Sequence, residues 1–311
     1  MLSLRTMETM NKKVTLVILG VLVIALAIAL FVSQQFGAPT ASTPEESGVD
    51  EVVTTTPASD GPTIETIGTS VEGRAIEQYT FGSGERHLLF VGGIHGGYEW
   101  NSSLLAWQSI DYFTFNPEEV PSDLTISIIP SLNPDGLALV TGTGGRFSKS
   151  DVSNPGVRNA EARMNANGVD LNRNFGCKWQ PESTWRGNVV SAGTSAFSEP
   201  EAMALKNLVE TDRPDAVLFW HSQANNVYAS ECQEGVLPAT LTLMNTYATA
   251  GNYGAVPVFD AYPITGDAEG WLASIGIPAV TVELESFSDI EWERNRAGIY
   301  AVMDTYSNIA K

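Results

Sequence analysis

The chain has 311 residues, with 17 Lys and Arg against 36 Asp and Glu, so its formal net charge is −19 at pH 7. An acid surplus of this size argues against nucleic acid as the main partner, because phosphate binding needs clustered positive charge. Hydrophobic residues make up 43% of the chain, which is enough for a large packed core and excludes a chain that is disordered throughout.

The first part of the chain predicts a membrane anchor. Residues 1–13 carry Arg5, Lys12 and Lys13, and residues 14–32 are uninterruptedly apolar. A helix of that length spans a bilayer, and the basic residues before it predict a cytoplasmic N-terminus and an extracytoplasmic remainder. The alternative is a signal peptide, whose apolar region usually has about 7–15 residues and whose cleavage would release a secreted protein.

Residues 33–63 are rich in Ser, Thr, Pro and acidic residues and lack apolar periodicity. This composition predicts a flexible, acidic tether. Residues 64–311 contain no internal repeat and no second linker, so we expect them to form one domain and the protein to be a monomer.

Within the predicted domain, short apolar runs bounded by Gly, Pro, Asn or Asp alternate with longer segments. The short runs predict buried strands and the longer segments predict helices. The predicted strands are 87–94, 124–132, 216–222 and 278–285, and predicted helices include 101–113 and 198–210. This alternation favours an α/β domain with a mixed, largely parallel twisted sheet flanked by helices.

The second of these helices carries a start signal of its own. Ser198 followed by Glu201 fits a capping box, and Pro200 falls in the first turn. This pattern predicts reciprocal side-chain hydrogen bonds at the beginning of the helix.

Polar residues follow the predicted strands. His95 and Glu99 come after the first, His221 ends the third, and Glu283 lies in the last. Because ligands collect at the carboxyl ends of parallel strands, we expect these side chains to meet. Two His and one Glu are a common catalytic zinc set that leaves a position open for water. The remaining histidine, His87, opens a strand and is expected to be structural or exposed.

The chain has two cysteines, Cys177 and Cys232. In an exported protein such a pair is more often a disulfide than a catalytic thiol. We therefore expect them to be bridged.

A set of motifs, in order along the chain, resembles the zinc carboxypeptidase family. The motifs are GTSVEGRAI (68–76), GGIHGGYEW (92–100), PSLNPDG (130–136), RMNANGVDLNRNF (163–175), FSEPEA (197–202), HS (221–222), YPITG (262–266) and TVEL (281–284). Single motifs are weak signals, but the ordered set is specific and covers nearly all of the chain after the tether. One departure is the first pair, which is H-x-x-E in the family but has an extra residue here. Gly96 and Gly97 are expected to absorb that residue through positive φ angles.

The resemblance implies one zinc ion per chain, held by His95, Glu99 and His221. It further implies a general base, two residues that hold the substrate's terminal carboxylate, and a mobile tyrosine that closes over the substrate. Glu283 would be the general base, Asn172 and Arg173 would hold the terminal carboxylate, and Tyr262 would be the mobile tyrosine. An arginine upstream stabilises the oxyanion in the family; Arg163 is the best match, with Arg158 and Arg146 as alternatives.

The family register places Glu269 at the floor of the specificity pocket, with Asp267 close by. Carboxylates there favour a basic C-terminal residue, or the amine of diaminopimelate. The implied function is a metallocarboxypeptidase acting on peptide or protein C-termini. Two alternatives remain at this point: a zinc amidase or deacylase acting on cell-wall stem peptides or N-acyl amino acids, and an inactive, membrane-tethered peptide-binding module.

Overall fold

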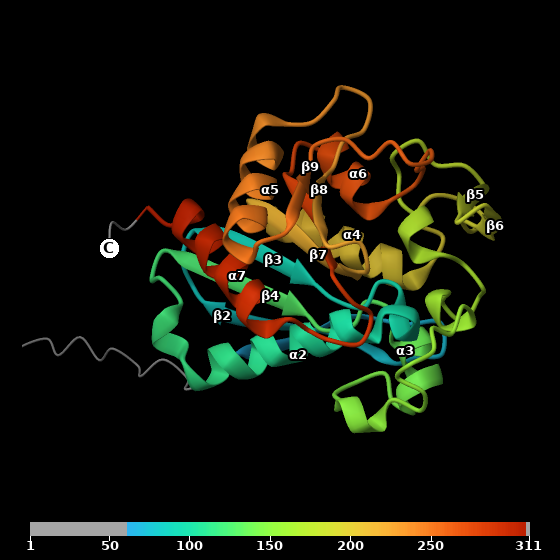
Figure 1. Ribbon diagram of the computed structural model, residues 1–311, viewed down its shortest axis with the longest axis horizontal. Coiled ribbons are helices and arrows are strands. Elements are labelled where there is room, and N and C mark those ends of the chain that lie inside the picture. The colour runs from blue at the N-terminus through green and yellow to red at the C-terminus, as the bar shows by residue number, and fades with distance from the viewer. Residues whose placement is uncertain (1–60, 309–311) are drawn as a thin grey trace, which may run out of the picture. The chain divides into compact units, whose positions relative to one another are not determined.

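A mixed sheet of eight strands forms the centre of the computed structural model, which describes residues 61–308 (Figure 1). The strands, in sheet order, are β1 (Thr63–Thr69), β2 (Ala75–Gly82), β4 (Leu124–Ile129), β3 (Arg86–Val91), β7 (Ala216–Ser222), β10 (Ala279–Leu284), β8 (Asn226–Ala229) and β9 (Gly254–Val256). A separate hairpin pairs β5 (Glu182–Trp185) with β6 (Asn188–Ser191).

The four predicted strands are confirmed as β3, β4, β7 and β10, which stand next to one another in the sheet. All three pairings among them are parallel. The antiparallel pairings involve β1, β2 and β8, so the predicted mixed α/β fold is also confirmed. The carboxyl ends of the parallel strands β3, β4, β7 and β10 therefore meet at one edge of the sheet, as the predicted zinc site requires.

Helices cover both faces of the sheet. They are α2 (Trp100–Phe115), α3 (Pro134–Thr141), α4 (Pro200–Asp212), α5 (Pro238–Gly251), α6 (Ala268–Ser274) and α7 (Trp292–Tyr306). Side chains alternate along β7: Leu218 and Trp220 join the core packed by α2, α5 and α7, whereas Val217 and Phe219 join the core packed by α4 and α6. In Figure 1 the red helix α7 lies on the near side of the sheet.

The predicted capping box at α4 is wrong. The residue that caps the helix is Glu199, which makes no side-chain cap bond. The Ser198 hydroxyl donates instead to Glu199 Oε1 (2.8 Å), and the carboxylate of Glu201 accepts from Val71 N and from Asn165 Nδ2 (both 3.1 Å). For Glu201, tertiary partners therefore replace the local bond that the pattern favours, and Ser198 bonds its neighbour instead of the helix backbone.

The predicted membrane span (14–32) and almost all of the tether lie outside the described residues. Within residues 61–308, no helix combines the length and apolarity needed to cross a bilayer. The anchor therefore stays a prediction from the sequence.

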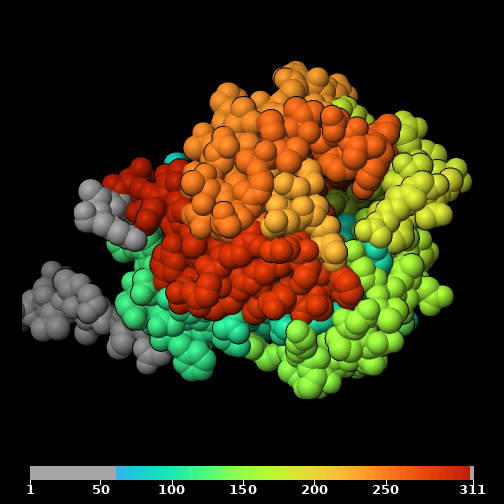
Figure 2. Space-filling view, viewed as in Figure 1, coloured from blue at the N-terminus to red at the C-terminus, as the bar shows by residue number. Residues whose placement is uncertain are grey.

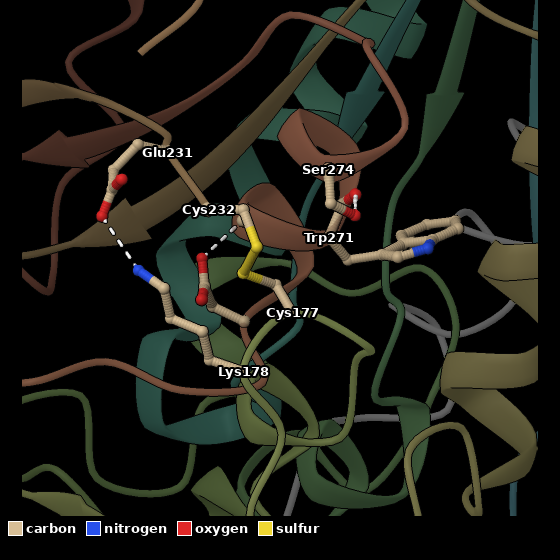
Figure 3. Close-up of a disulfide and its surroundings, with 8 residues drawn as sticks. Cys177, Lys178, Glu231, Cys232, Trp271 and Ser274 are labelled. Atoms are coloured by element: carbon tan, nitrogen blue, oxygen red, sulfur yellow. Dashed lines mark hydrogen bonds and ion pairs between the residues drawn. A yellow bond between two sulfur atoms is a disulfide. The ribbon is translucent and has the colours of Figure 1, made fainter. Parts of the chain in front are cut away.

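Cys177 and Cys232 form a disulfide, with Cα atoms 6.0 Å apart (Figure 3). Both residues are buried, and the neighbouring residues Lys178 and Glu231 form an ion pair at 3.2 Å beside the bridge. The bridge spans a sequence separation of 55 residues. It ties the segment that follows Arg173 to the chain just beyond β8.

The disulfide gives the first prediction. Replacing Cys177 and Cys232 together by serine should lower the free energy of unfolding by about 2–4 kcal/mol, because the unfolded chain is no longer constrained. Urea unfolding measures the change. Adding dithiothreitol should destabilise the unmodified protein and leave the double variant unaffected; equal stability of the two proteins without reductant would contradict the prediction.

Candidate active site

Three adjacent strands deliver the chemically capable side chains. His95 follows β3, His221 lies in β7, and Glu283 lies in β10 directly opposite His221 in the parallel register. Glu99 completes the group from the single 3₁₀ turn that precedes α2. The described chain thus brings the predicted residues to one edge of the sheet.

The three predicted zinc ligands converge. Glu99 Oε2 lies 3.1 Å from His95 Nδ1 and 3.1 Å from His221 Nδ1, and the two imidazole nitrogens are 3.2 Å apart. All three side chains are buried. Two ligands at zinc's usual distances and a tetrahedral angle are about 3.3 Å apart, so this donor set fits the ion. Within residues 61–308, these three side chains form the group of His, Cys, Asp or Glu residues that lie close enough together to bind a metal ion.

The extra residue between His95 and Glu99 is absorbed by a 3₁₀ helix at Gly96–Glu99. Gly96 has φ +46°, as expected, but Gly97 is not among the positive-φ glycines. Gly97 matters for a different reason: an added Cβ would come within 2.5 Å of Val140 Cγ2. Close packing of this turn against α3, rather than a second unusual φ angle, fixes the position of Glu99.

Each imidazole has a carboxylate behind it. His95 Nε2 lies 3.6 Å from Asp170 Oδ1, and His221 Nε2 lies 3.3 Å from Glu269 Oε1. Such outer carboxylates orient metal-binding histidines and raise their basicity. Although burial alone would lower it, contacts with Glu269 and Glu99 raise the pKa of His221 to about 10. This strongly negative surrounding favours a cation.

Glu99 carries the negative charge at the centre of the group. Burial would raise the pKa of its carboxyl group, but His95 and His221 hold that pKa well below its usual range. Arg158 NH2 and Arg163 NH1 also lie 3.4 Å and 3.7 Å from Glu99 Oε1. Glu99 is therefore ionised at neutral pH, as a ligand must be.

Glu283 has the properties of a general base. Burial, followed by repulsion from Glu99, raises the pKa of Glu283 to about 7. Its Oε2 atom is buried without a hydrogen-bond partner. A carboxylate with a pKa near the working pH and an unused acceptor can take a proton from water.

The structure separates the three arginines that the sequence left open. Arg146 is exposed and pairs with Asp111 at 2.7 Å, away from the site. Arg163 is buried, donates from Nε to Asp170 (2.9 Å) and lines the cavity. Arg158 lines it as well. Of the two, Arg163 shares a carboxylate with the ligand His95.

Asn172 and Arg173 lie side by side in a 3₁₀ turn, Leu171–Arg173, and both line the cavity. The Asn172 amide oxygen accepts from Ala268 N (2.8 Å), which ties this turn to α6. Arg173 NH1 donates to Asn172 O, while Arg173 Nε is buried without a partner. The guanidinium therefore has a donor left for a ligand.

These residues line a cavity of about 560 Å³. Figure 2 shows the surface hollowed where teal atoms lie between the orange and yellow-green parts of the chain. Tyr262 lines the cavity, as does Trp185 of the β5–β6 hairpin. Trp185 was not predicted from the sequence; its ring lies against the Arg163 guanidinium, with 4.6 Å between Cζ and the ring centroid.

Glu269 lies at the cavity, but its carboxylate is engaged there. Oε1 accepts from Thr281 Oγ1 (2.8 Å) and is the atom that lies beside His221. Asp267 also lines the cavity and is partly exposed. Burial, followed by repulsion from Glu269, raises the pKa of Asp267 to about 6. Asp267 Oδ2 also caps α6 by accepting from Gly270 N (2.7 Å), so both acids are engaged and Asp267 is the more exposed of the two.

Comparison with known proteins agrees with this geometry. A family model described as zinc carboxypeptidase matches residues 55–290. Gamma-D-glutamyl-L-diamino acid endopeptidase 1 of Lysinibacillus sphaericus is 26% identical over 71% of this chain, and carboxypeptidase B of Helicoverpa zea is 27% identical over 74%. The chain spans 60% and 59% of the lengths of these two proteins.

Among solved structures, murein-tripeptide amidase MpaA from Escherichia coli O157 has a TM-score of 0.58 and 23% sequence identity. The match covers 80% of this chain and 94% of that one, and it supports the fold. Together with the grouping of His95, Glu99 and His221, the family match confirms the zinc cofactor predicted from the sequence.

The carboxylate behind His221 gives the second prediction. Replacing Glu269 by Gln should weaken zinc binding about 10–100-fold, since the imidazole loses its charged partner. Competition with a chromogenic chelator measures the affinity. Glu231→Gln, which removes a partly exposed acid at the cavity rim, serves as the control and should bind zinc normally. Unchanged affinity in Glu269→Gln would refute this role.

Proposed function

We propose that this chain, which belongs to the zinc carboxypeptidase family, is a metallocarboxypeptidase that hydrolyses the C-terminal bond of peptides. The observation that carries the proposal is one cavity holding a zinc ligand set, a carboxylate poised as a base and a guanidinium with an unused donor. His95, Glu99 and His221 form the ligand set, Glu283 is the base, and Arg173 carries the unused donor.

The substrate is held by its terminal carboxylate. Arg173 donates to that carboxylate from its planar guanidinium, which suits two parallel hydrogen bonds. Asn172 lies beside it and offers its amide nitrogen. This clamp restricts cleavage to the last bond. Tyr262 lies at the same cavity and closes over the bound residue.

Bound zinc supplies a Lewis acid and lowers the pKa of water. Glu283 accepts a proton from the attacking water and delivers it to the leaving amine as the C–N bond breaks. Arg163, held by Asp170 at 2.9 Å, faces the negative charge that develops on the carbonyl oxygen. The ion pair with Asp170 keeps the guanidinium in place throughout.

A second candidate is an amidase acting on cell-wall stem peptides. Arg173 and Asp267 both line the cavity and interact electrostatically. Together they suit a leaving residue that offers both a carboxylate and an amine, such as lysine or diaminopimelate. Two relatives named for such chemistry, the endopeptidase above and murein peptide amidase A of Escherichia coli, support this candidate. An inactive binding module is disfavoured, because such a module has no need for Glu283.

We also infer that the domain works outside the cytoplasm, tethered to the bilayer. The apolar run at 14–32, with basic residues before it, supports this location. The Cys177–Cys232 disulfide supports it too, since such bonds persist in oxidising compartments. Protease added to intact cells should therefore remove the domain; protection until the cells are lysed would contradict the inference.

The main test uses Glu283→Gln. Its turnover of a peptide library, read by mass spectrometry, should fall about 10²–10⁴-fold, because the base is lost. Zinc content should stay at that of the unmodified protein.

In the unmodified protein, kcat/KM should rise as the pH increases towards 7, because Glu283 loses its proton over this range. A zinc ion bound nearby lowers the pKa of Glu283, so it moves this rise in kcat/KM to lower pH.

The same digest separates the candidates. Loss of single C-terminal residues, with Lys or Arg released faster than Phe or Leu, supports the carboxypeptidase with a basic preference. Cleavage confined to stem peptides supports the amidase. A zinc-loaded protein that cleaves no peptide of either kind would refute the proposed function.

A further inference from the structure

Arg158 is a cavity residue to which the proposed mechanism gives no task. Its guanidinium stacks on Tyr98, with Cζ 3.8 Å from the ring centroid, and only 13% of its side chain is exposed. NH2 donates to Ser222 O at 2.6 Å and lies 3.4 Å from Glu99 Oε1. The side chain is therefore fixed next to the metal ligands, in contact with the residue that follows His221.

Most of the hydrogen-bonding capacity of Arg158 is unused. A guanidinium has five N–H donors. Within residues 61–308, NH2 makes the hydrogen bonds of this side chain, and Nε is buried without a partner. Burial also lowers the pKa of Arg158, so its charge is held at some cost. A buried cation with free donors at a cavity wall suits an anionic ligand.

Arg158 and Arg173 contact different parts of the cavity wall. Arg173 donates to Thr184 O in the β5–β6 hairpin at 3.4 Å, while Arg158 contacts Ser222 at the end of β7. The Arg158 guanidinium also lies 5.6 Å from the ring of Phe287, beyond β10. With the leaving residue's carboxylate on Arg173 and the scissile carbonyl at the zinc ligands, Arg158 falls to the acyl side of the bond.

We propose that Arg158 binds a carboxylate carried by the residue that precedes the scissile bond. This inference rests on the proposed function and narrows its substrates to peptides with an acidic group at that position. The group can be the side-chain carboxylate of an α-linked glutamate. It can also be the main-chain carboxylate of a γ-linked glutamate, which places the same chemistry beside the bond.

The test measures binding without turnover. The full-length Glu283→Gln chain, in detergent and loaded with zinc, is titrated calorimetrically with two pairs of dipeptides. One pair is acetyl-Glu-Lys and acetyl-Gln-Lys, and the other is acetyl-γ-Glu-Lys and the same peptide with its glutamyl main-chain carboxylate converted to the amide. In at least one pair the acid should bind about tenfold or more tightly than the amide, as a charge-assisted hydrogen bond predicts. The pair with that preference identifies the linkage.

Adding Arg158→Gln should reduce the acid-to-amide ratio to about one, because the affinity for the acid should fall far more than the affinity for the amide. Arg146→Gln, which removes an exposed arginine away from the cavity, is the matched control and should keep the full ratio. Zinc content is measured for each variant.

The inference is overturned if acid and amide bind equally in both pairs, if no probe binds, or if Arg158→Gln leaves the ratio unchanged. A loss of affinity for acid and amide alike also overturns it, since Arg158 would then only support Tyr98 and the ligand turn. If the probes bind with the expected ratio but the active chain cleaves none of them, the proposed function falls while the carboxylate site stands.

Discussion

The site depends on one buried negative charge, the carboxylate of Glu99, held between the imidazoles of His95 and His221. A lone carboxylate in this position would carry a large desolvation penalty. The two histidines at 3.1 Å and the two guanidinium groups at 3.4 and 3.7 Å offset that penalty. The same arrangement leaves both Nδ1 atoms directed at one point. The two histidines that stabilise the buried carboxylate of Glu99 are thus the same residues that join it in binding a cation.

The sheet makes this arrangement possible because neighbouring parallel strands end together. His221 and Glu283 are in register on β7 and β10, so the metal-site histidine and the proposed base are held at a fixed separation by backbone hydrogen bonds. Behind them, Asp170 and Glu269 hold the histidine rings from the other side. Loops supply the remaining groups, which is where substrate preference can vary without disturbing the metal ligands.

The central strands could be predicted from the sequence, and with them the side chains of His95, His221 and Glu283. A His or Glu that follows, ends or lies within a buried apolar run is unusual and therefore informative. It did not predict β1, whose side chains are mostly exposed, since no apolar run marks it. It also misjudged Gly97 and the partners of Ser198, and it did not predict that Glu269 lies beside His221. Those outcomes depend on atoms brought close by the fold, such as Val140 against Gly97, and no local pattern encodes them.

The covalent loop closed by Cys177 and Cys232 contains β7, and hence His221, while His95 and Glu99 lie outside it. Oxidation of the two thiols therefore shortens the path along the chain from Glu99 to His221. The shorter path lowers the entropy cost of bringing the three metal-binding side chains together. A closed bridge should therefore favour ion binding, and a bound ion should favour the closed bridge, because each reduces the entropy that the other must overcome. Metal supply and oxidative folding are coupled through a single loop.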